Sequence, residues 1–176
     1  TIADSTVDYV VLEGGTPTVT GNTITDSEPI RITDPDAQTT GFSGNTYTAP
    51  APVIDIQGWL EGTRTLGFVE GIGTYGLTAD LTVNTTGAMT IAPGVELRDD
   101  VDVDADGTPR GLWVHGLLDA GGAVFSGDHQ NVIVGSLGQM DLADCIFTGS
   151  GATVNYYDYG TDGSRGTLDH VTGSDW

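Results

Sequence analysis

Gly21-Asn22-Thr23-Ile24-Thr25 and Gly44-Asn45-Thr46-Tyr47-Thr48 are two copies of one short phrase, offset by 23 residues. Each copy is followed by an apolar–polar–apolar triplet, first Ile30-Arg31-Ile32 and then Ile54-Asp55-Ile56. A weaker copy is found at Cys145-Ile146-Phe147-Thr148-Gly149. Repetition at a period of about 20–50 residues is typical of chains that stack similar units into a solenoid. The repeat therefore predicts the fold class before any functional motif is considered.

The pattern of apolar residues around these phrases is that of strands. Helical periodicity is nearly absent, and short alternating runs are separated by Gly, Asn, Asp, Ser or Pro, as in strands with one buried face. We expect strands at 7–12, 18–20, 23–25, 30–33, 53–57, 81–84, 88–91, 95–98, 111–115, 131–134, 140–142, 145–148, 153–156 and 167–171. Hairpin signals are few. The sequence therefore predicts an all-β, right-handed parallel β-helix with coils of about 20–25 residues.

Two residue types have a predicted role inside this solenoid. Asn22 and Asn45 occupy equivalent coil positions, so we expect their amides to stack as an internal ladder that satisfies backbone groups at a turn. Cys145 is the single cysteine, and its neighbours are mostly apolar with no basic residue close in sequence. Such a cysteine is typically a small buried side chain rather than a reactive thiol.

The stretch 75–97 contains three phrases in a specific order: Asp-Leu-Thr-Val, Gly-Ala-Met-Thr-Ile and Pro-Gly-Val. It is followed by Gly-Leu-Trp-Val-His-Gly-Leu-Leu-Asp-Ala-Gly at 111–121 and by Gly-Thr-Leu-Asp-His-Val at 166–171. This order resembles the opening coils of right-handed parallel β-helix domains in large secreted or cell-surface proteins of bacteria and archaea. The resemblance implies an extracellular or cell-surface location.

The same comparison suggests how the chain is organised. Residues 1–57 resemble the later coils of such a domain, and residues 77–176 resemble its opening coils with an acidic loop inserted at 98–110. Residues 58–76 are expected to form an irregular connection between the two runs. We interpret the whole as one continuous or stacked solenoid.

Charge excludes several classes of partner. The chain has 25 acidic residues against five basic ones, all arginine, and a formal net charge of −20. Nucleic acid and anionic lipid both require basic residues, so we expect neither as a partner. No apolar run reaches the roughly 18 residues that a membrane-spanning helix needs. An acidic surface suits an extracellular setting or a medium rich in salt or divalent cations.

A calcium site is the first candidate for chemistry. Asp102, Asp104 and Asp106, followed by Gly107, have the spacing that begins an EF-hand calcium loop. Position 12 of that loop would be Trp113 instead of Glu, and no flanking helices are expected. A solvated acidic loop is the alternative interpretation, so Ca²⁺ is a candidate ligand and no other cofactor is expected.

Catalysis is not expected. Asp99-Asp100 followed by His115 resembles the paired carboxylates and histidine of β-helix polygalacturonases, in which one acid and one base act on a glycosidic bond. The Asn-Thr-Asp and Arg-Ile-Lys phrases of that family are absent, so we assign no catalytic residues. A polysaccharide hydrolase or lyase remains the alternative. Asn84, in Asn84-Thr85-Thr86, is the single N-glycosylation sequon.

The two ends of the chain resemble each other. Thr6-Val7-Asp8-Tyr9-Val10 matches Thr167-Leu168-Asp169-His170-Val171, either as a common coil phrase or because the chain is one unit of a longer array. Solenoids need caps, and open coil ends expose strand edges that invite pairing. The candidate assembly residues are Val7, Tyr9, Val10, Leu168, His170 and Val171.

We therefore expect an extracellular structural β-solenoid: a subunit or segment of a filament, stalk or adhesin. It would stack end to end by strand pairing, head to tail with itself or with flanking β-helix coils. The alternative is a β-helix that binds or cleaves carbohydrate, with a polysaccharide as partner.

Overall fold

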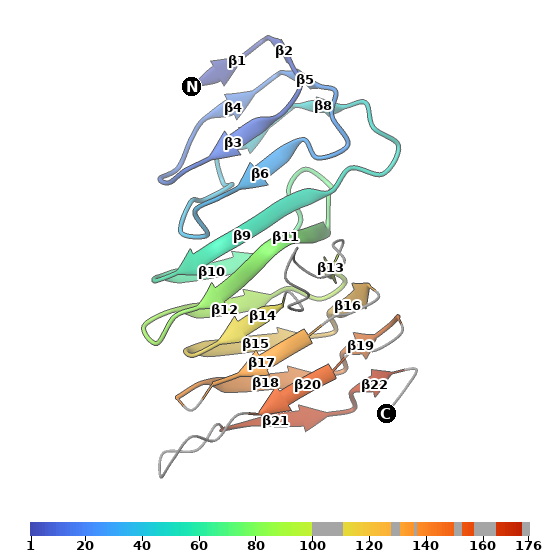
Figure 1. Ribbon diagram of the computed structural model, residues 1–176. Helices are drawn as coiled ribbons and strands as arrows, with labels where there is room; N and C mark the ends of the chain where they lie inside the picture. The colour runs from blue at the N-terminus through green and yellow to red at the C-terminus, as the bar shows by residue number, and fades with distance from the viewer. Residues whose placement is uncertain (100–110, 128–130, 136, 150–152, 157–164, 174–176) are drawn as a thin grey trace.

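The structure, a computed structural model, describes residues 1–99, 111–127, 131–135, 137–149, 153–156 and 165–173. Short strands follow one another around the chain and stack in parallel into a β-solenoid of about six turns, with the two termini at opposite ends of the stack (Figure 1). No helix occurs in these ranges. The predicted all-β parallel solenoid is therefore confirmed.

Four sheets form the walls, and all pairings between their strands are parallel. Two three-stranded sheets belong to the first coils: β1 (Ile2–Ala3), β4 (Val19–Thr20) and β7 (Phe42–Ser43), then β2 (Thr6–Val7), β5 (Thr23–Ile24) and β8 (Thr46–Tyr47). A five-stranded sheet belongs to the later coils: β10 (Thr63–Leu66), β12 (Ala88–Ile91), β15 (Leu117–Gly121), β18 (Gln139–Ala143) and β21 (Arg165–Asp169).

The fourth sheet has 11 strands and runs through the whole stack. Its members are β3 (Val10–Leu12), β6 (Ile30–Ile32), β9 (Ile54–Leu60), β11 (Thr74–Val83), β13 (Glu96–Asp99), β14 (Leu112–Val114), β16 (Val124–Gly127), β17 (Asn131–Val134), β19 (Ile146–Phe147), β20 (Thr153–Tyr156) and β22 (Thr172–Gly173).

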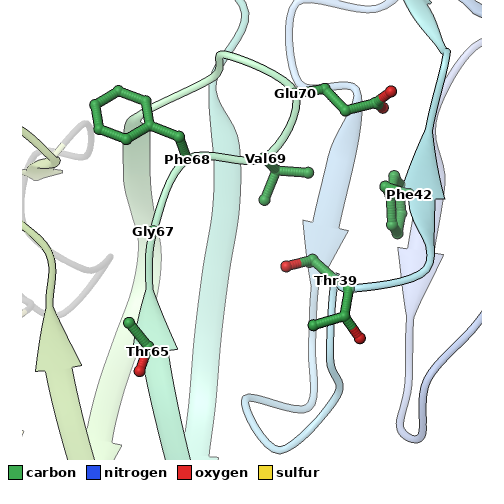
Figure 2. A pocket seen from close by; sticks show the side chains of 8 residues that line it. Thr39, Phe42, Thr65, Gly67, Phe68, Val69 and Glu70 are labelled. Atoms are coloured by element: carbon green, nitrogen blue, oxygen red, sulfur yellow. The ribbon is translucent and has the colours of Figure 1, made fainter.

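The two runs of coils are joined through β9 and β11. Ile54 pairs with Tyr75 and Gly58 pairs with Leu81, with a shift of register between the two paired segments. By contrast, β7 and β8 end their sheets, and β10 begins another. Residues 58–76, expected to be an irregular connection, thus contain the end of β9, all of β10 and the start of β11. Strand pairing is interrupted between β7 and β10. Figure 2 shows the segment around Phe42 apart from the strand and loop that carry Thr65 and Val69.

One backbone corner repeats along the stack. At six places, a residue with φ between 49° and 68° stands two positions after an apolar residue of the preceding strand. Glycine is favoured in this left-handed region, and aspartate tolerates it better than most residues. The repeated Gly-Asn-Thr phrases and the weaker copy at Cys145 are three of these corners. The corner residues are Asp4, Gly21, Gly44, Gly122, Asp144 and His170.

The residue after each corner points into the stack, and in the first coils it forms the predicted asparagine ladder. Asn22, only 1% exposed, donates from its backbone N–H and from Nδ2 to Oδ1 of Asn45, at 2.9 Å each. The Ser5 N–H donates in turn to Oδ1 of Asn22 at 3.0 Å. The ladder ends where the Asn45 N–H donates to the Glu70 carboxylate at 2.9 Å. The expected ladder is confirmed, and Glu70 is its previously unassigned last member.

Cys145 follows another of these corners, at Asp144. Its side chain is fully buried, and its Sγ lies 3.3 Å from the carbonyl oxygen of Ala120. Burial raises the pKa of the thiol. The prediction of a buried cysteine is confirmed.

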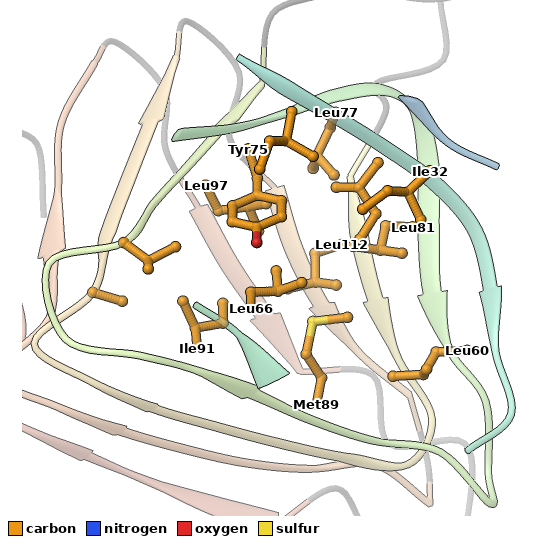
Figure 3. Packing of buried hydrophobic residues seen from close by; sticks show 14 of the residues in the cluster. Ile32, Leu60, Leu66, Tyr75, Leu77, Leu81, Met89, Ile91, Leu97 and Leu112 are labelled. Atoms are coloured by element: carbon orange, nitrogen blue, oxygen red, sulfur yellow. The ribbon is translucent and has the colours of Figure 1, made fainter. Parts of the chain in front are cut away.

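Apolar side chains from successive strands fill the interior (Figure 3). Leu77, Leu81 and Leu112 are among the residues with no exposed surface. Tyr75 is the one tyrosine among the fully buried side chains of the described chain, and its hydroxyl donates to the carbonyl of Gly67 at 2.7 Å. Burial raises the pKa of Tyr75 to about 12. A buried hydroxyl with a backbone acceptor is compatible with an apolar core.

A buried arginine holds the loop that precedes β7. Arg64, on β10, is 2% exposed, and its Nη1 donates to the carbonyls of Pro35, at 2.8 Å, and Ala37. Burial lowers the pKa of this guanidinium. Asp36 in the same loop accepts the N–H of Gly62 at 2.8 Å. Together these bonds fix residues 35–37 against the start of the later coils.

Replacing Asn22 by alanine is expected to destabilise the fold by about 1–3 kcal/mol, because the Ser5 N–H and other buried backbone groups lose their partner. Urea unfolding followed by circular dichroism measures the change. Thr46→Ala, on the exposed face of the neighbouring coil, is the matched control and is expected to stay within about 0.5 kcal/mol of wild type. Equal stability of the two variants would contradict a structural role for the ladder.

The corner conformation yields a second test. Gly122 has φ of 67°, yet a Cβ built on it would lie no closer than 3.5 Å to any heavy atom. Gly122→Ala should therefore cost about 1–2 kcal/mol through backbone conformation alone. Gly121→Ala is the control, since its Cβ would meet nothing within 4 Å and no left-handed φ is required there. We expect that variant to be neutral or slightly more stable in the same urea measurement. A neutral Gly122→Ala would contradict the corner's requirement.

Candidate functional site

The first coil presents the N-terminal end of the stack. Val7 is partly buried and packs against the core, as does Ile2, while Val10 is 4% exposed. Tyr9 points to the side, where its ring lies 3.9 Å under the guanidinium of Arg31. Of the three N-terminal assembly candidates, Val7 therefore belongs to the open end, Val10 lies mainly in the core, and Tyr9 forms a lateral cation–π contact.

The last described coil presents the opposite end. Leu168 pairs in register with the buried Leu142 but is itself 47% exposed. Val154 and Val171 are partly buried and pack against the core from the same coil. His170 is a corner residue whose Nδ1 lies 3.0 Å from the Asp169 carboxylate. Apolar side chains of the core thus continue to this end without a further described coil above them.

Strand register corrects the match between the two ends. Thr6 pairs with Thr23 and follows its corner, whereas Thr167 pairs with Asp141 and precedes its corner. The matching phrases therefore occupy different coil positions. Through the 11-stranded sheet, β22 is instead the equivalent of β3, because Gly173 is connected to Val10 by successive register pairs through Phe147, Phe125, Leu97, Tyr75, Ile54 and Ile30. The phrase similarity reflects strand composition and not coil phase.

A cleft of about 290 Å³ opens where the first coils meet the later ones. Figure 2 shows Thr39 and Phe42 on one wall and Thr65 and Val69 on the other. Glu70 lies at its edge, where it accepts the hydroxyl of Tyr47 at 2.8 Å in addition to terminating the asparagine ladder. Burial and this carboxylate raise the pKa of Tyr47. The carboxylate of Glu70 thus helps to hold the first and later coils together.

A second concave site, of about 370 Å³, lies on the lateral face of the 11-stranded sheet. Its lining residues come from β9, β11, β14 and the turns that follow β11 and β14. They are Trp59, Asp80, Thr82, Asn84, Trp113 and His115. Trp59 and Trp113 are both register partners of Thr82, one on each side. The alternation in Leu112-Trp113-Val114 is a local signal for an outward Trp113, whereas Trp59 lies in the stretch expected to be irregular. Only the register of β9 with β11 and of β14 with β11 reveals that the two tryptophans flank one residue.

The residues that resemble those of polygalacturonases lie on different elements or outside the described ranges, and the calcium candidates lie outside these ranges. Asp99 is 6% exposed on β13, whereas His115 follows β14 and lines the tryptophan-containing site. Asp100 and the calcium candidates Asp102, Asp104 and Asp106 are outside the described residues. Within the described part of the chain, no group of three His, Cys, Asp or Glu side chains could hold a metal ion. Calcium binding therefore remains a prediction.

Asn84, the sequon residue, lies at the rim of the same lateral site. Its Nδ2 donates to Oε1 of Glu61 at 2.8 Å, and its Oδ1 accepts the N–H of Thr85 at 2.9 Å. Both ends of the amide are thus engaged with neighbouring residues. Glycosylation at Asn84 remains a prediction.

Comparisons with protein-family models, curated proteins and solved structures find no match to this chain. Across the described ranges, nothing helical is long and apolar enough to cross a membrane. The solenoid therefore offers two kinds of exposed surface for a function: its end coils and its lateral site.

Asp141 links the last described coil to the one before it. Its Oδ1 accepts the backbone N–H of Thr167 at 3.1 Å and the Thr167 hydroxyl at 3.0 Å, while Oδ2 accepts from Gln139 at 2.9 Å. The hydrogen bond from Gln139 and then those from Thr167 lower the pKa of this carboxyl. The ionised form is therefore the one that holds the terminal coil.

Because the folded-state pKa of Asp141 is below its ordinary value, its stabilisation is fully present above that value and is lost as the pH falls through the folded pKa. The protection factors of the β21 amides, which are exchange rates corrected for the intrinsic rate at each pH, should fall below about pH 4. Asp141→Asn keeps an acceptor oxygen but cannot titrate, so its protection factors should lack this acid-dependent fall. The same fall in wild type and variant would contradict the assignment.

Proposed function

We propose that this chain is a structural segment of an extracellular β-solenoid assembly and that it stacks end to end with a second copy by strand pairing. The observation that supports the proposal is that one sheet reaches both ends of the described stack. β3 is its edge strand in the first coil, and β22 is an edge strand of the same sheet in the last described coil.

These edges make the two ends complementary as parallel neighbours. A copy added at the C-terminal end would bring its β3 beside β22 and so continue the 11-stranded sheet. Backbone N–H and C=O groups at such edges are strong donors and acceptors, and exposed edges are templates for further strands. Strand addition of this kind derives affinity from main-chain hydrogen bonds and specificity from side-chain packing.

Side-chain packing favours the same arrangement. Stacking would bring the partly buried side chains of the first coil, Ile2 and Val7, onto the exposed Leu168, whose register partner Leu142 belongs to the core. Since Leu168 is about half exposed at the free end, its burial would contribute about 1 kcal/mol for each junction. The apolar contact is modest, so the backbone ladder would supply much of the specificity.

Charge sets the conditions for assembly. A net charge of −20 opposes the approach of two copies, and salt screens this repulsion over roughly 8 Å at physiological ionic strength. Assembly is therefore expected to strengthen as salt is raised from low to physiological levels. The acidic surface without lysine supports the extracellular setting. The role that follows is mechanical: a filament, stalk or adhesin segment.

The test blocks each end separately. Leu168→Asp with Val171→Asp places carboxylates on the C-terminal face, and Ile2→Asp with Val7→Asp does so on the N-terminal face. We expect wild type to form elongated oligomers and each blocked variant to be monomeric by analytical ultracentrifugation. A mixture of the two variants should form dimers, because each retains one intact and complementary end.

Leu117→Asp is the control, since Leu117 is 38% exposed on the lateral surface, away from both ends. It should assemble as wild type does, and circular dichroism should show a folded solenoid for every variant. A wild-type chain that stays monomeric at all concentrations and salt levels would overturn the proposal. Equal loss of assembly in Leu117→Asp would also overturn it.

A further inference from the structure

The lateral site on β9, β11 and β14 has the construction of a binding platform. Trp59 and Trp113 flank Thr82 in register, so the three side chains form one outward row across three consecutive coils. Neighbouring strands are about 4.8 Å apart, which places the two tryptophans roughly 10 Å apart along the stack. Trp59 is 66% exposed, the largest fraction among the exposed large hydrophobic residues of the described chain. Large aromatic surface left in a groove is typical of a contact site.

The polar groups of this groove divide into engaged and available ones. Asp80 accepts the N–H of Gly111 at 3.1 Å, and Asn84 donates to Glu61 at 2.8 Å. By contrast, Nε1 of Trp113 is buried and has no hydrogen-bond partner in the described structure. A buried N–H without an acceptor is costly, so a shift of the indole that brings this N–H to an acceptor on a ligand would be favourable. The group that most needs a partner is thus a neutral donor beside an aromatic face.

This combination of groups selects a class of ligand. A pyranose ring has a face of C–H groups that can pack on an indole and a rim of hydroxyls that can accept from an N–H. An anionic sugar would meet the carboxylates of Asp80 and Glu61 and a chain of net charge −20. We propose that the groove binds a neutral oligosaccharide, which lies along the solenoid axis with its rings on Trp59 and Trp113. The hydroxyl rim of one ring accepts the Trp113 N–H.

The groove is independent of the stacking surfaces. Its residues lie on β9, β11, β14 and the adjoining turns, in the middle of the stack, whereas stacking involves the first and last coils (Figure 1). An assembly would repeat the groove once for each copy along its side. Binding by the monomer and binding by an assembly therefore use the same residues, and either proposal can fail without the other.

The experiment measures binding of defined oligosaccharides, and of one cationic peptide, by isothermal titration calorimetry and by tryptophan fluorescence. The neutral probes are cellohexaose, maltohexaose, mannohexaose and xylohexaose, and the charged probes are hexagalacturonate and hexalysine. We expect at least one neutral probe to bind, with Trp59→Ala weakening the affinity roughly tenfold. Trp113→Phe keeps a ring but removes the N–H, and it should weaken binding roughly three- to tenfold.

Phe68→Ala is the matched control, because Phe68 is also an exposed aromatic residue, at 57%, but lines the junction cleft instead of the lateral groove. This variant should bind as wild type does, and urea unfolding should show that Trp59→Ala is as stable as Phe68→Ala. No binding of any neutral probe at millimolar concentration would overturn the proposal. Preferential binding of hexagalacturonate or hexalysine, or binding unaffected by Trp59→Ala, would also overturn it.

Discussion

The pairing of β9 with β11 is the interaction on which the rest of the structure depends. The first coils close their own sheets at β7 and β8, and the later coils begin a new sheet at β10, so only the 11-stranded sheet passes between them. The side chain of Glu70 reinforces this junction by taking the place of a further asparagine in the ladder. Arg64 does so from the other side by binding the carbonyls of the loop before β7. One continuous core follows from that single shared sheet.

The same pairing creates both concave sites. Where strands are missing between the two runs, the walls separate into the cleft beside Phe42 and Glu70. Where strands are continuous, Trp59 on β9 comes into line with Thr82 and Trp113. A solenoid repeats its neighbours in one direction, so a residue type placed outward on every second coil becomes a row rather than an isolated side chain. The lateral row and the open end coils are consequences of one architecture, and they lie on different surfaces.

Corner chemistry explains why the repeats are hard to recognise in the later coils. The left-handed corner accepts glycine, aspartate or histidine, and the inward residue after it changes from serine and asparagine to alanine, cysteine and valine. What is retained is backbone conformation and the inward direction, not residue identity. Behind such corners, the amides of Asn22 and Asn45 fill the interior in the first coils, and the buried thiol of Cys145 does so in a later coil. Phrase matching alone misaligned the two ends of the chain. Thr6 follows the corner at Asp4, whereas Thr167 precedes the corner at His170.

The sequence by itself determined the fold class, the internal asparagine ladder, the buried cysteine and most strands, because alternation and a recurring turn are local patterns. It did not predict the strands at 2–3, 42–43, 46–47, 63–66, 117–121, 124–127 and 172–173. These strands are short, and their pairing partners are a whole coil away. Only the tertiary structure decided which residues stack: that Glu70 follows Asn45, that Val10 and Gly173 lie in one column of the 11-stranded sheet, and that Trp59 and Trp113 share Thr82. The physical reason is that coil lengths vary, so the distance along the chain between stacked residues is set by loops and by the register shift in β11, and neither can be read from local alternation.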